Sequence, residues 1–409
     1  RADWLHGNER PSPALTALTR PPRRPASIPA VRAANGSLLT HPPDIAACLV
    51  EHFAAISAEP PAAPAASLAV LQSVRDAVSS GATRGIDPAA AAAAGRPTFT
   101  TAEVTSILAA VPRGSSPGPD GLSYEFWALA EPDPADPAAP PTRVWAPLLA
   151  RLFSAMPATN SLPAGFLDGT VAPIPKPGTP DLVAPAANRP FTLLNADYRV
   201  VTRGLAGRYS EVLSPAIDPG QAAFLLGRRI EEPLLTTFLA DNALAADARQ
   251  AVAVFLDIAK AYDTVSRPFL FEAMSALGAS PGMIGWARLL LTSTTATVRA
   301  NGVESAPLLW AAGVRQGCPL SPALYLFVAQ ALTCWLRANP ELGIVVNGSR
   351  HVAAQYADDT TVYLAMPPPA GVALVRCRDV FGDAANQRGN QSKSKAAVLG
   401  AGGGAAPPP

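Results

Sequence analysis

The sequence predicts an α+β fold in which antiparallel β-strands are backed by helices. Short apolar runs of strand length occur at residues 252–257, 352–356 and 360–365, and longer stretches with helical spacing occur at 267–277 and 322–339. With 409 residues, 49% of them apolar and 15% charged, the chain can bury one large core or two domains. It is therefore an enzyme-sized chain and not a small binding module.

The first expected strand is Val252–Asp257, which is short and apolar enough to be buried. A helix is expected next over Arg267–Leu277, and Gly278 is suited to cap its C-terminus because glycine adopts the left-handed conformation without strain. Asn301-Gly302 then follows the strand-like run Thr295–Ala300. This dipeptide predicts a β-hairpin with a two-residue turn.

Proline at position 322 suits the first turn of a helix, and the apolar run behind it predicts a helix to about Asn339. The 21 residues Gln316–Leu336 carry no charge and are long enough to span a membrane. Polar and proline residues interrupt this stretch, namely Pro319, Ser321, Pro322, Gln330 and Thr333. We therefore predict a buried core helix, and no membrane partner.

Two further strands, Val352–Tyr356 and Thr360–Ala365, place Asp358 and Asp359 at a tight turn. An isolated Asp-Asp pair is more often a solvated turn, but this hairpin is expected beside the strand that ends in Asp257. Phosphoryl transfer to a sugar hydroxyl uses two divalent cations about 4 Å apart, and Mg²⁺ binds carboxylate oxygens. The acids therefore predict a nucleotidyl-transfer site, with Asp257 and Asp358 as the first metal ligands and Asp359 as the second-rank carboxylate.

Several sequence motifs precede or separate these acids in a fixed order. They are Pro117–Leu122, Ile174–Pro177, Asn188–Asn195, Gln221–Arg228 and Gly313–Pro322. With these motifs the chain resembles the reverse transcriptases of non-LTR (LINE-type) retrotransposons, from about Thr98 to Lys395. The most specific string is Arg-Gln-Gly-Cys-Pro-Leu-Ser-Pro within the last motif. The resemblance implies a right-hand polymerase fold with fingers and palm.

The same resemblance suggests how the chain is divided. Fingers are expected over residues 98–246, and a palm over 247–396 with an antiparallel sheet backed by helices. Residues 1–97 are expected to form a Pro/Ala-rich N-terminal extension that is partly disordered, and 397–409 a disordered tail. Proline contributes 45 of the 409 residues, roughly twice its usual share, and clusters outside the motifs. We expect the thumb to be missing, so that the chain is either fingers and palm from a longer polyprotein or a degenerate genomic copy.

The resemblance also assigns substrate-binding roles. Tyr262 matches the aromatic residue beneath the incoming sugar, where its ring would exclude a ribose 2′-hydroxyl; as a single residue it also fits a core aromatic. Gln316 and Gly317 match the residues that lie against the nascent base pair and the template, where glycine allows close backbone approach.

Three cations match positions that contact phosphate in this family. Lys176 and Arg189 match the finger residues that hold the triphosphate, and Lys393 matches a palm lysine that approaches pyrophosphate and donates a proton to it. Cations suit these roles because charge develops on the phosphoryl oxygens during the reaction. Each of them also fits an ordinary surface charge, and Lys393 fits a solvated pair with Lys395.

The formal net charge is only +1, so binding to a nucleic-acid backbone requires a local basic patch. One candidate is the N-terminal arm, which fits a solvated flexible segment equally well and contains Arg10, Arg20, Arg23, Arg24 and Arg32. The four cysteines and four histidines show no zinc-binding spacing, which argues against a structural zinc and against disulfides. The implied cofactor is Mg²⁺, as two ions, with Mn²⁺ as an acceptable substitute.

The implied activity is that of an RNA-directed DNA polymerase, with an RNA template, a DNA primer and deoxynucleoside triphosphates as partners. Its catalytic residues would be Asp257, Asp358, Asp359 and Lys393, and the family's priming on chromosomal DNA implies a nuclear location. A catalytically silent remnant that at most binds nucleic acid remains open, because a truncated chain would be weakly active or inactive. An RNA-dependent RNA polymerase is a third reading, which Tyr262 and the Tyr-Ala-Asp-Asp sequence disfavour. The sequence does not determine the oligomeric state.

Overall fold

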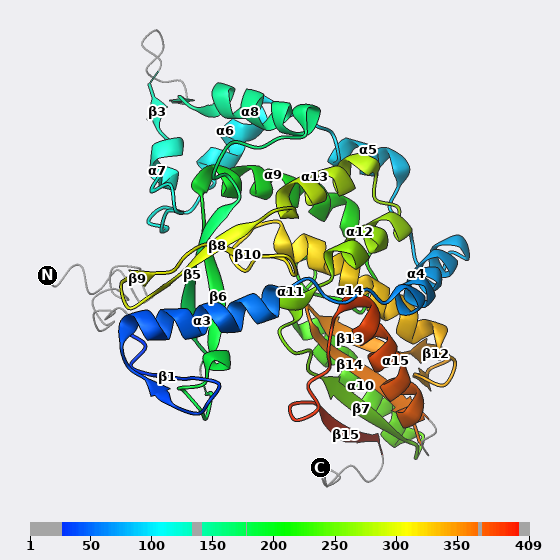
Figure 1. Ribbon diagram of the computed structural model, residues 1–409. Helices are drawn as coiled ribbons and strands as arrows, with labels where there is room; N and C mark the ends of the chain where they lie inside the picture. Colours follow the sequence, from blue (N-terminus) through cyan, green and yellow to red (C-terminus); the bar gives the residue numbers. More distant parts are fainter. Residues whose placement is uncertain (1–26, 133–140, 177, 367–369, 401–409) are drawn as a thin grey trace, which may run out of the picture.

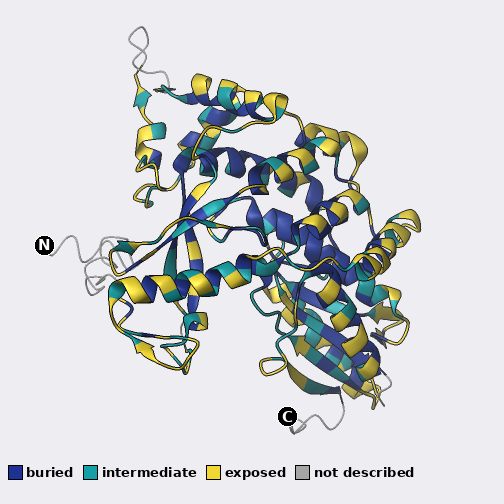
Figure 2. Cartoon of the chain, in the orientation of Figure 1, coloured by how far each residue is buried: buried dark blue, intermediate teal, exposed yellow. Residues whose placement is uncertain are grey.

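The computed structural model describes residues 27–132, 141–176, 178–366 and 370–400. These residues form two main β-sheets and a layer of helices beside them (Figure 1). Buried residues are concentrated where the helices meet one another and where they face the sheets (Figure 2). The predicted α+β class is confirmed.

The four-stranded sheet carries the predicted acids. Its strands are antiparallel, in the order β13-β14-β7-β15. The bounds are β7 Gln250–Leu256, β13 Ala353–Tyr356, β14 Asp359–Ala365 and β15 Lys395–Gly400. Leu256 pairs with Thr360, so the next residue, Asp257, lies beside the β13–β14 turn. The expected hairpin beside the Asp257 strand is therefore confirmed.

Two details of this sheet differ from the sequence prediction. The tight turn consists of Ala357 and Asp358, because Asp359 already pairs with Tyr356 as the first residue of β14. Residues 397–400, expected in the disordered tail, belong to β15 because they pair with β7. The rest of the expected tail, 401–409, lies outside the described residues.

Helices cover both faces of the four-stranded sheet. One face, with Val252, Val254 and Leu256, packs in a core with α14 (Ser321–Ala338), α15 (Ala370–Ala385) and α4 (Pro64–Ser79). The other face, with Ala251 and Ala253, packs against α10 (Glu231–Ala246). Nearly all of α14 is buried, as predicted for the charge-free stretch. In the part of the chain that the structure describes, no helix has the length and apolarity needed to cross a membrane.

The five-stranded sheet has the order β10-β8-β5-β6, with β9 paired to β8. The bounds are β5 Asp168–Pro175, β6 Asn188–Leu194, β8 Thr295–Ala300, β9 Val303–Glu304 and β10 Leu308–Leu309. The predicted hairpin is confirmed, because Asn301 and Gly302 have φ angles of 50° and 82° between β8 and β9. Since β8 pairs with β5, this sheet joins segments from both sides of the predicted domain boundary at residue 246, and the boundary remains a prediction.

The helical layer lies above the sheets in Figure 1. Its helices are α5 Pro88–Ala94, α6 Thr101–Ala109, α7 Tyr124–Trp127, α8 Ala146–Thr159, α9 Ala196–Leu213, α12 Arg267–Ala276 and α13 Pro281–Leu291. Helix α12 confirms the helix expected at 267–277, and Gly278 follows it with φ +97°. The short, alanine-rich helix α5 is capped by the Asp87 side chain, whose Oδ1 accepts from the N–H of Ala90 at 2.8 Å.

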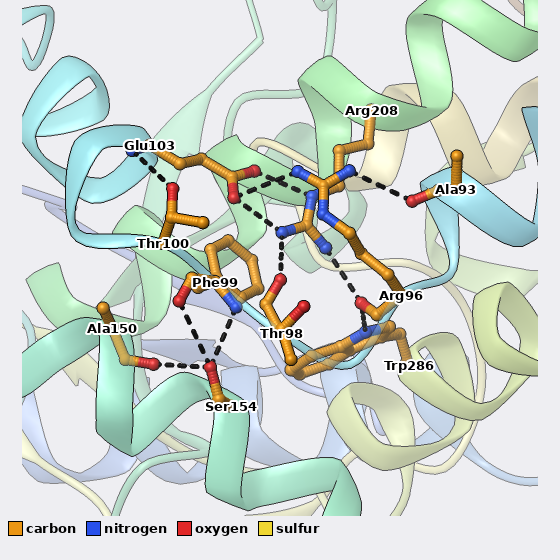
Figure 3. A network of polar contacts seen from close by, with 10 residues as sticks. All are labelled: Ala93, Arg96, Thr98, Phe99, Thr100, Glu103, Ala150, Ser154, Arg208 and Trp286. Atoms are coloured by element: carbon orange, nitrogen blue, oxygen red, sulfur yellow. Dashed lines mark hydrogen bonds and ion pairs between the residues drawn. The ribbon is translucent and has the colours of Figure 1, made fainter.

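An ion pair between a buried arginine and a partly buried glutamate connects two of these helices (Figure 3). Arg208 on α9 donates from Nε and Nη2 to the two carboxylate oxygens of Glu103 on α6, at 2.8 Å each. The same guanidinium donates to the carbonyl oxygens of Arg96 and Thr98. Every side of this charge is thus compensated, which is what a buried arginine requires.

The N-terminal segment folds against the five-stranded sheet. It contains β1 (Val31–Arg32), β2 (Leu38–Leu39) and α3 (Pro42–Ser57), whose apolar face packs against β8. Arg32 pairs with Asp181 at 3.0 Å, whereas Arg10, Arg20, Arg23 and Arg24 lie outside the described residues. The remaining short elements are β3 Ala130–Glu131, β4 Thr142–Arg143, η1 Pro185–Ala187, β11 Ile344–Val346 and β12 Ser349–His351.

Candidate active site

A cleft of about 730 Å³ lies where the ends of the two sheets face each other. Its walls come from the end of β5, the start of β6, the segment after β7, the β13–β14 turn and the loop before α14. All the predicted site residues except Asp359 line this cleft: Lys176, Arg189, Asp257, Tyr262, Gln316, Gly317, Asp358 and Lys393. The fold therefore gathers residues that are up to 217 positions apart (393 − 176).

Asp257 and Asp358 form the acidic side of the cleft. The backbone of Asp257 is held by Ser394 and Asn390: its N–H donates to Ser394 Oγ at 3.2 Å, and its carbonyl accepts from Asn390 N at 2.7 Å. Burial raises the pKa of Asp358, and the charges of Asp359 and Asp257 raise it further. The carboxylates therefore lie close enough to repel one another.

Asp359 lies next to this site but faces another groove. As the first residue of β14 it lines a separate hollow together with Tyr356 and Phe255. Burial and the charge of Asp257 raise the pKa of Asp359. The Asp359 carboxylate is therefore still repelled by the acid on the cleft side. Asp358 lies in the turn and Asp359 is already the first residue of β14, and the two neighbouring acids line different grooves.

The turn that carries Asp358 is held by a buried glutamine from a distant motif. Gln221 is 1% exposed. Its Oε1 accepts from the N–H of Ala357 at 2.9 Å, and its Nε2 donates to the carbonyl of Ala357 at 3.0 Å. Ala357 has a φ of 59°, which is unfavourable for a residue with a Cβ. We infer that Gln221 stabilises this strained turn and so fixes the position of Asp358.

The basic side of the cleft comes from the five-stranded sheet and its surroundings. Lys176 follows β5 directly, and Arg189 is the partner of Ile174 on β6. Lys176 Nζ donates to the carbonyl of Ala186 at 2.8 Å. Burial and the charge of Lys393 lower the pKa of Lys176. This side therefore carries excess positive charge, opposite the acids.

Tyr262 stands between the two sides, on the short helix α11 (Ala261–Thr264). Its ring stacks on that of Tyr325, with centroids 4.4 Å apart and an interplanar angle of 18°. Its hydroxyl is buried and has no hydrogen-bond partner among the described residues. Burial and the charge of Asp358 raise the pKa of Tyr262, so the phenol stays protonated. The ring thus both packs in the core and lines the cleft.

The loop before α14 brings Gln316 and Gly317 to the cleft. The N–H of Thr192 on β6 donates to the carbonyl of Gln316 at 2.9 Å. Gly317 has φ +104°, and a Cβ there would lie 2.5 Å from the carbonyl oxygen of Thr192. Glycine is therefore required at this position for close approach to the protein's own backbone, a reason that the sequence did not reveal.

A comparison with protein-family models gives a match to the reverse transcriptase (RNA-dependent DNA polymerase) family. The match covers residues 174–400, more than half of the 409-residue chain, and includes all of the acidic and basic residues described for the cleft. The chain belongs to the reverse transcriptase family. The resemblance inferred from the motifs is confirmed.

Individual relatives point to the same group of mobile elements. The chain is 29% identical over 311 residues to the transposon TX1 uncharacterized 149 kDa protein of Xenopus laevis, covering 74% of this chain and 22% of that protein. It is 32% identical over 190 residues to a Pol polyprotein from the type-1 retrotransposable element R2 of Popillia japonica, covering 46% of this chain and 26% of the relative. The RNA-directed DNA polymerase from mobile element jockey of Drosophila melanogaster is 27% identical over 266 residues, which is 64% of this chain and 27% of the relative. The chain thus spans about a quarter of the length of these relatives.

Sequence reasoning missed several charged residues of this reverse transcriptase cleft, and three of them lie close to predicted site residues in the chain. Lys260, Asp263 and Arg315 line the cleft, and Asp263 and Arg315 are 5% and 2% exposed. Burial raises the pKa of Asp263 to about 6, and burial together with the charge of Lys176 lowers that of Lys260. Their positions next to Tyr262 and Gln316 in the sequence were the available signal.

Reverse transcriptases use divalent metal ions, and the acidic side of the cleft fits one. Asp257 and Asp358 offer carboxylate oxygens that open into the same cleft, and the raised pKa of Asp358 reflects a charge that a cation would compensate. Within the described ranges, no group of three or more His, Cys, Asp or Glu side chains is arranged to hold an ion alone. Mg²⁺ does not need such a cage, because it commonly binds one or two carboxylates and completes its shell with water and substrate phosphates.

Proposed function

We propose that this chain contains the nucleotidyl-transfer centre of an RNA-directed DNA polymerase from a non-LTR retrotransposon. It would add deoxynucleotides to the 3′-hydroxyl of a DNA primer on an RNA template, acting on chromosomal DNA and therefore in the nucleus. One observation carries the proposal: a single cleft has paired carboxylates on one side and clustered cations on the other. A nucleoside triphosphate needs both, because its phosphates bind cations directly and carboxylates through a metal ion.

The acids would hold the metal ions. Asp257 and Asp358 are the ligands that face the cleft, and Asp359 is a weaker candidate because it lines the neighbouring groove. Two Mg²⁺ ions, or Mn²⁺ in their place, would activate the primer hydroxyl and neutralise the leaving pyrophosphate. The contribution of the protein is to hold both carboxylates in one place, through Gln221 and the β7–β14 pairing.

The cations would bind the triphosphate. Lys176 and Arg189 come from one sheet and Lys393 from the loop before β15, so they can contact different phosphate oxygens. A proton is needed on the departing pyrophosphate, and Lys393 is a donor in reach of the same cleft.

Tyr262 would select the sugar. Its ring borders the cleft five residues after Asp257 and is held by the stack on Tyr325. A fixed aromatic face beneath a deoxyribose leaves no room for a 2′-hydroxyl. Tyr262→Val should therefore raise ribonucleotide incorporation relative to deoxynucleotide by about 10–100-fold. Tyr262→Phe is the matched control and should leave selection unchanged, because the hydroxyl is buried and unbonded within the described structure.

The two sheets suggest which parts serve as palm and fingers. The four-stranded antiparallel sheet with α14 and α15 behind it has the character of a palm, since it carries the acids on a short hairpin. The five-stranded sheet has the character of fingers, since it carries Lys176 and Arg189.

Primer extension tests the proposal directly. The purified chain is given a DNA primer on an RNA template with Mg²⁺, and deoxynucleotides are compared with ribonucleotides. We expect extension with deoxynucleotides that disappears in Asp358→Asn. Extension with ribonucleotides alone would identify an RNA-dependent RNA polymerase instead. RNA binding without incorporation of either nucleotide would identify a catalytically silent remnant.

A further inference from the structure

The backbone around Gln316 is fixed from two sides without help from its side chain. On one side, Gly313 N donates to the carbonyl of Val265 at 2.8 Å, and Val314 N donates to the carbonyl of Tyr262 at 2.7 Å. On the other side, the Gln316 carbonyl accepts from Thr192, and Gly317 packs against the same residue. The main chain of this loop is therefore set, and the side-chain torsions of Gln316 remain to be fixed.

Asp263 supplies the contact that fixes them. Its carboxylate is 5% exposed and receives Gln316 Nε2 on both oxygens, at 2.8 Å from Oδ1 and 3.0 Å from Oδ2. An ionised carboxylate can only accept hydrogen bonds, so it requires the NH₂ end of the amide and not the carbonyl end. The polarity of the pair thus follows from the charge on Asp263.

Keeping a buried carboxylate beside a neutral amide is costly for the fold. Burial raises the pKa of Asp263 to about 6, even though the Gln316 hydrogen bonds and the charges of Lys176 and Lys260 lower it. A neutral Asn or Ser would satisfy the same amide without burying a charge. The retained charge therefore suggests a task that depends on the direction of the hydrogen bond.

We propose that Asp263 is a positioning residue that orients the Gln316 amide for nucleotide binding. With Nε2 turned toward Asp263, Oε1 is the atom left to accept a hydrogen bond from a donor on the bound nucleotide. Asp263 itself needs no contact with the nucleotide. This inference rests on the proposed function of the cleft, but the orientation of Gln316 can be measured without it.

The test compares three variants of the whole chain by steady-state primer extension at pH 8. In Asp263→Asn the amide can adopt either orientation, so we expect KM for the deoxynucleotide to rise about tenfold with kcat within about twofold. In Gln316→Glu two carboxylates face each other, and we expect kcat/KM to fall about 100-fold. The double variant combines the two substitutions and restores a hydrogen bond of reversed polarity. The new amide at position 263 donates to the new carboxylate at position 316, and one oxygen of that carboxylate still accepts from the nucleotide.

We therefore expect the double variant to recover at least about tenfold in kcat/KM over Gln316→Glu alone, a coupling expected of residues in contact. A purely structural role for Asp263 would instead lower the fraction of folded chain in Asp263→Asn, which reduces the apparent kcat and leaves KM unchanged. An unchanged KM in Asp263→Asn, or a double variant no better than Gln316→Glu, would overturn the proposal. Asp379→Asn, which alters an exposed acid paired with Arg378, is the control and should not change KM.

A second measurement separates this inference from the proposed activity. In a sample labelled with ¹⁵N-glutamine, the Gln316 side-chain NH₂ signal is identified by its loss in Gln316→Glu, and its hydrogen exchange is followed. We expect slow exchange in the wild type and fast exchange in Asp263→Asn. If the wild type extends no primer yet shows this difference, the proposed activity fails and the orientation of Gln316 stands. Equal exchange in both proteins would refute the role of Asp263.

Discussion

Two clusters of enclosed charge in this molecule differ in how their charges are arranged. In the helical layer, Arg208 and Glu103 are opposite charges that satisfy each other, with further hydrogen bonds to backbone carbonyls (Figure 3). In the cleft, like charges lie together: Asp257 beside Asp358, and Lys176 in the field of Lys393. The charges of the first cluster are balanced by each other, whereas like charges in the second cluster are left to be balanced by a bound ligand or ion.

The pKa shifts report this difference. Burial alone would raise the pKa of Glu103, but the hydrogen bonds and charge of Arg208 outweigh it and the pKa is lowered. In the cleft, burial and like charge act in the same direction, so the pKa of Asp358 is raised and that of Lys176 is lowered. A cluster of the first kind stabilises a fold, and one of the second kind is suited to binding counter-charges from solution.

The sharpest test of the comparison is Asp358→Asn. If the acids act as metal ligands, the variant should lose on the order of 10³-fold in primer extension. Because the folded pKa of Asp358 lies above its ordinary value of 3.8, its ionisation opposes folding as pH rises through the folded pKa. The variant should therefore have a higher free energy of unfolding than the wild type at pH 8, measured by urea titration.

Mg²⁺ supplies the control for that result. The ion should raise the Tm of the wild type and raise that of Asp358→Asn less, because only the folded wild type binds it fully. An equal rise in both proteins would argue against Asp358 as a ligand, and lower stability of the variant at pH 8 would argue that the carboxylate is structural.

Arg208→Ala should have the opposite outcome. Removal of Arg208 takes away the stronger partner of the partly buried Glu103 carboxylate, which keeps Arg96 at 3.2 Å. It also leaves the carbonyls of Arg96 and Thr98 without this donor. We therefore expect a loss of about 1–3 kcal/mol in the free energy of unfolding. The folded pKa of Glu103 lies below its ordinary value of 4.5, so its contribution is present at neutral pH and is lost as pH falls through the folded pKa. The stability difference between the two proteins should shrink in acid.

The matched control is Arg299→Ala, which removes an exposed ion pair with Glu304 and should cost at most about 1 kcal/mol. Similar losses in the two variants would mean that burial does not distinguish these pairs. At a temperature where Arg208→Ala is fully folded, its primer extension should match the wild type, and a large loss would connect the helical layer to the chemistry.

The next prediction compares two glycine substitutions. It tests whether close backbone packing between Gly317 and β6, and not paired charge, holds the cleft rigid. Gly317→Ala combines φ +104° with a Cβ 2.5 Å from the Thr192 carbonyl, and should cost about 2–4 kcal/mol. Gly302→Ala has φ +82° with no atom within 4 Å of the new Cβ, and should cost about 1–2 kcal/mol. Equal losses in thermal unfolding would show that the contact with β6 is unimportant.

The smallest expected effect concerns the basic side. Lys176→Ala should raise KM for the deoxynucleotide about tenfold and leave the free energy of unfolding unchanged or higher, because the lysine is poorly compensated in the free protein. Arg189→Ala should likewise weaken nucleotide binding, and tighter binding would contradict its role. Arg299→Ala, which removes an exposed arginine paired with Glu304 outside the cleft, is the control that should leave KM unchanged.

Local patterns in the sequence were sufficient for much of this picture. The strand ending at Asp257, the Asn301-Gly302 hairpin and the helix opened by Pro322 each depend on a few neighbouring residues whose conformational preferences agree with the fold. The family match likewise follows from ordered motifs, and the acids and motif residues predicted for the site line the cleft, except Asp359.

Only the tertiary structure decided how those residues are held and which way they face. Gln221 contacts the Ala357 turn across 136 positions, and Asp263 orients Gln316 across 53; no local pattern encodes such pairings. Asp359 faces a different groove from Asp358 because its pairing with Tyr356 begins a strand there. Sequence thus determined which chemical groups the chain carries. The partners of these groups and the directions of their side chains depend on long-range packing, because they are set by segments that meet only after folding.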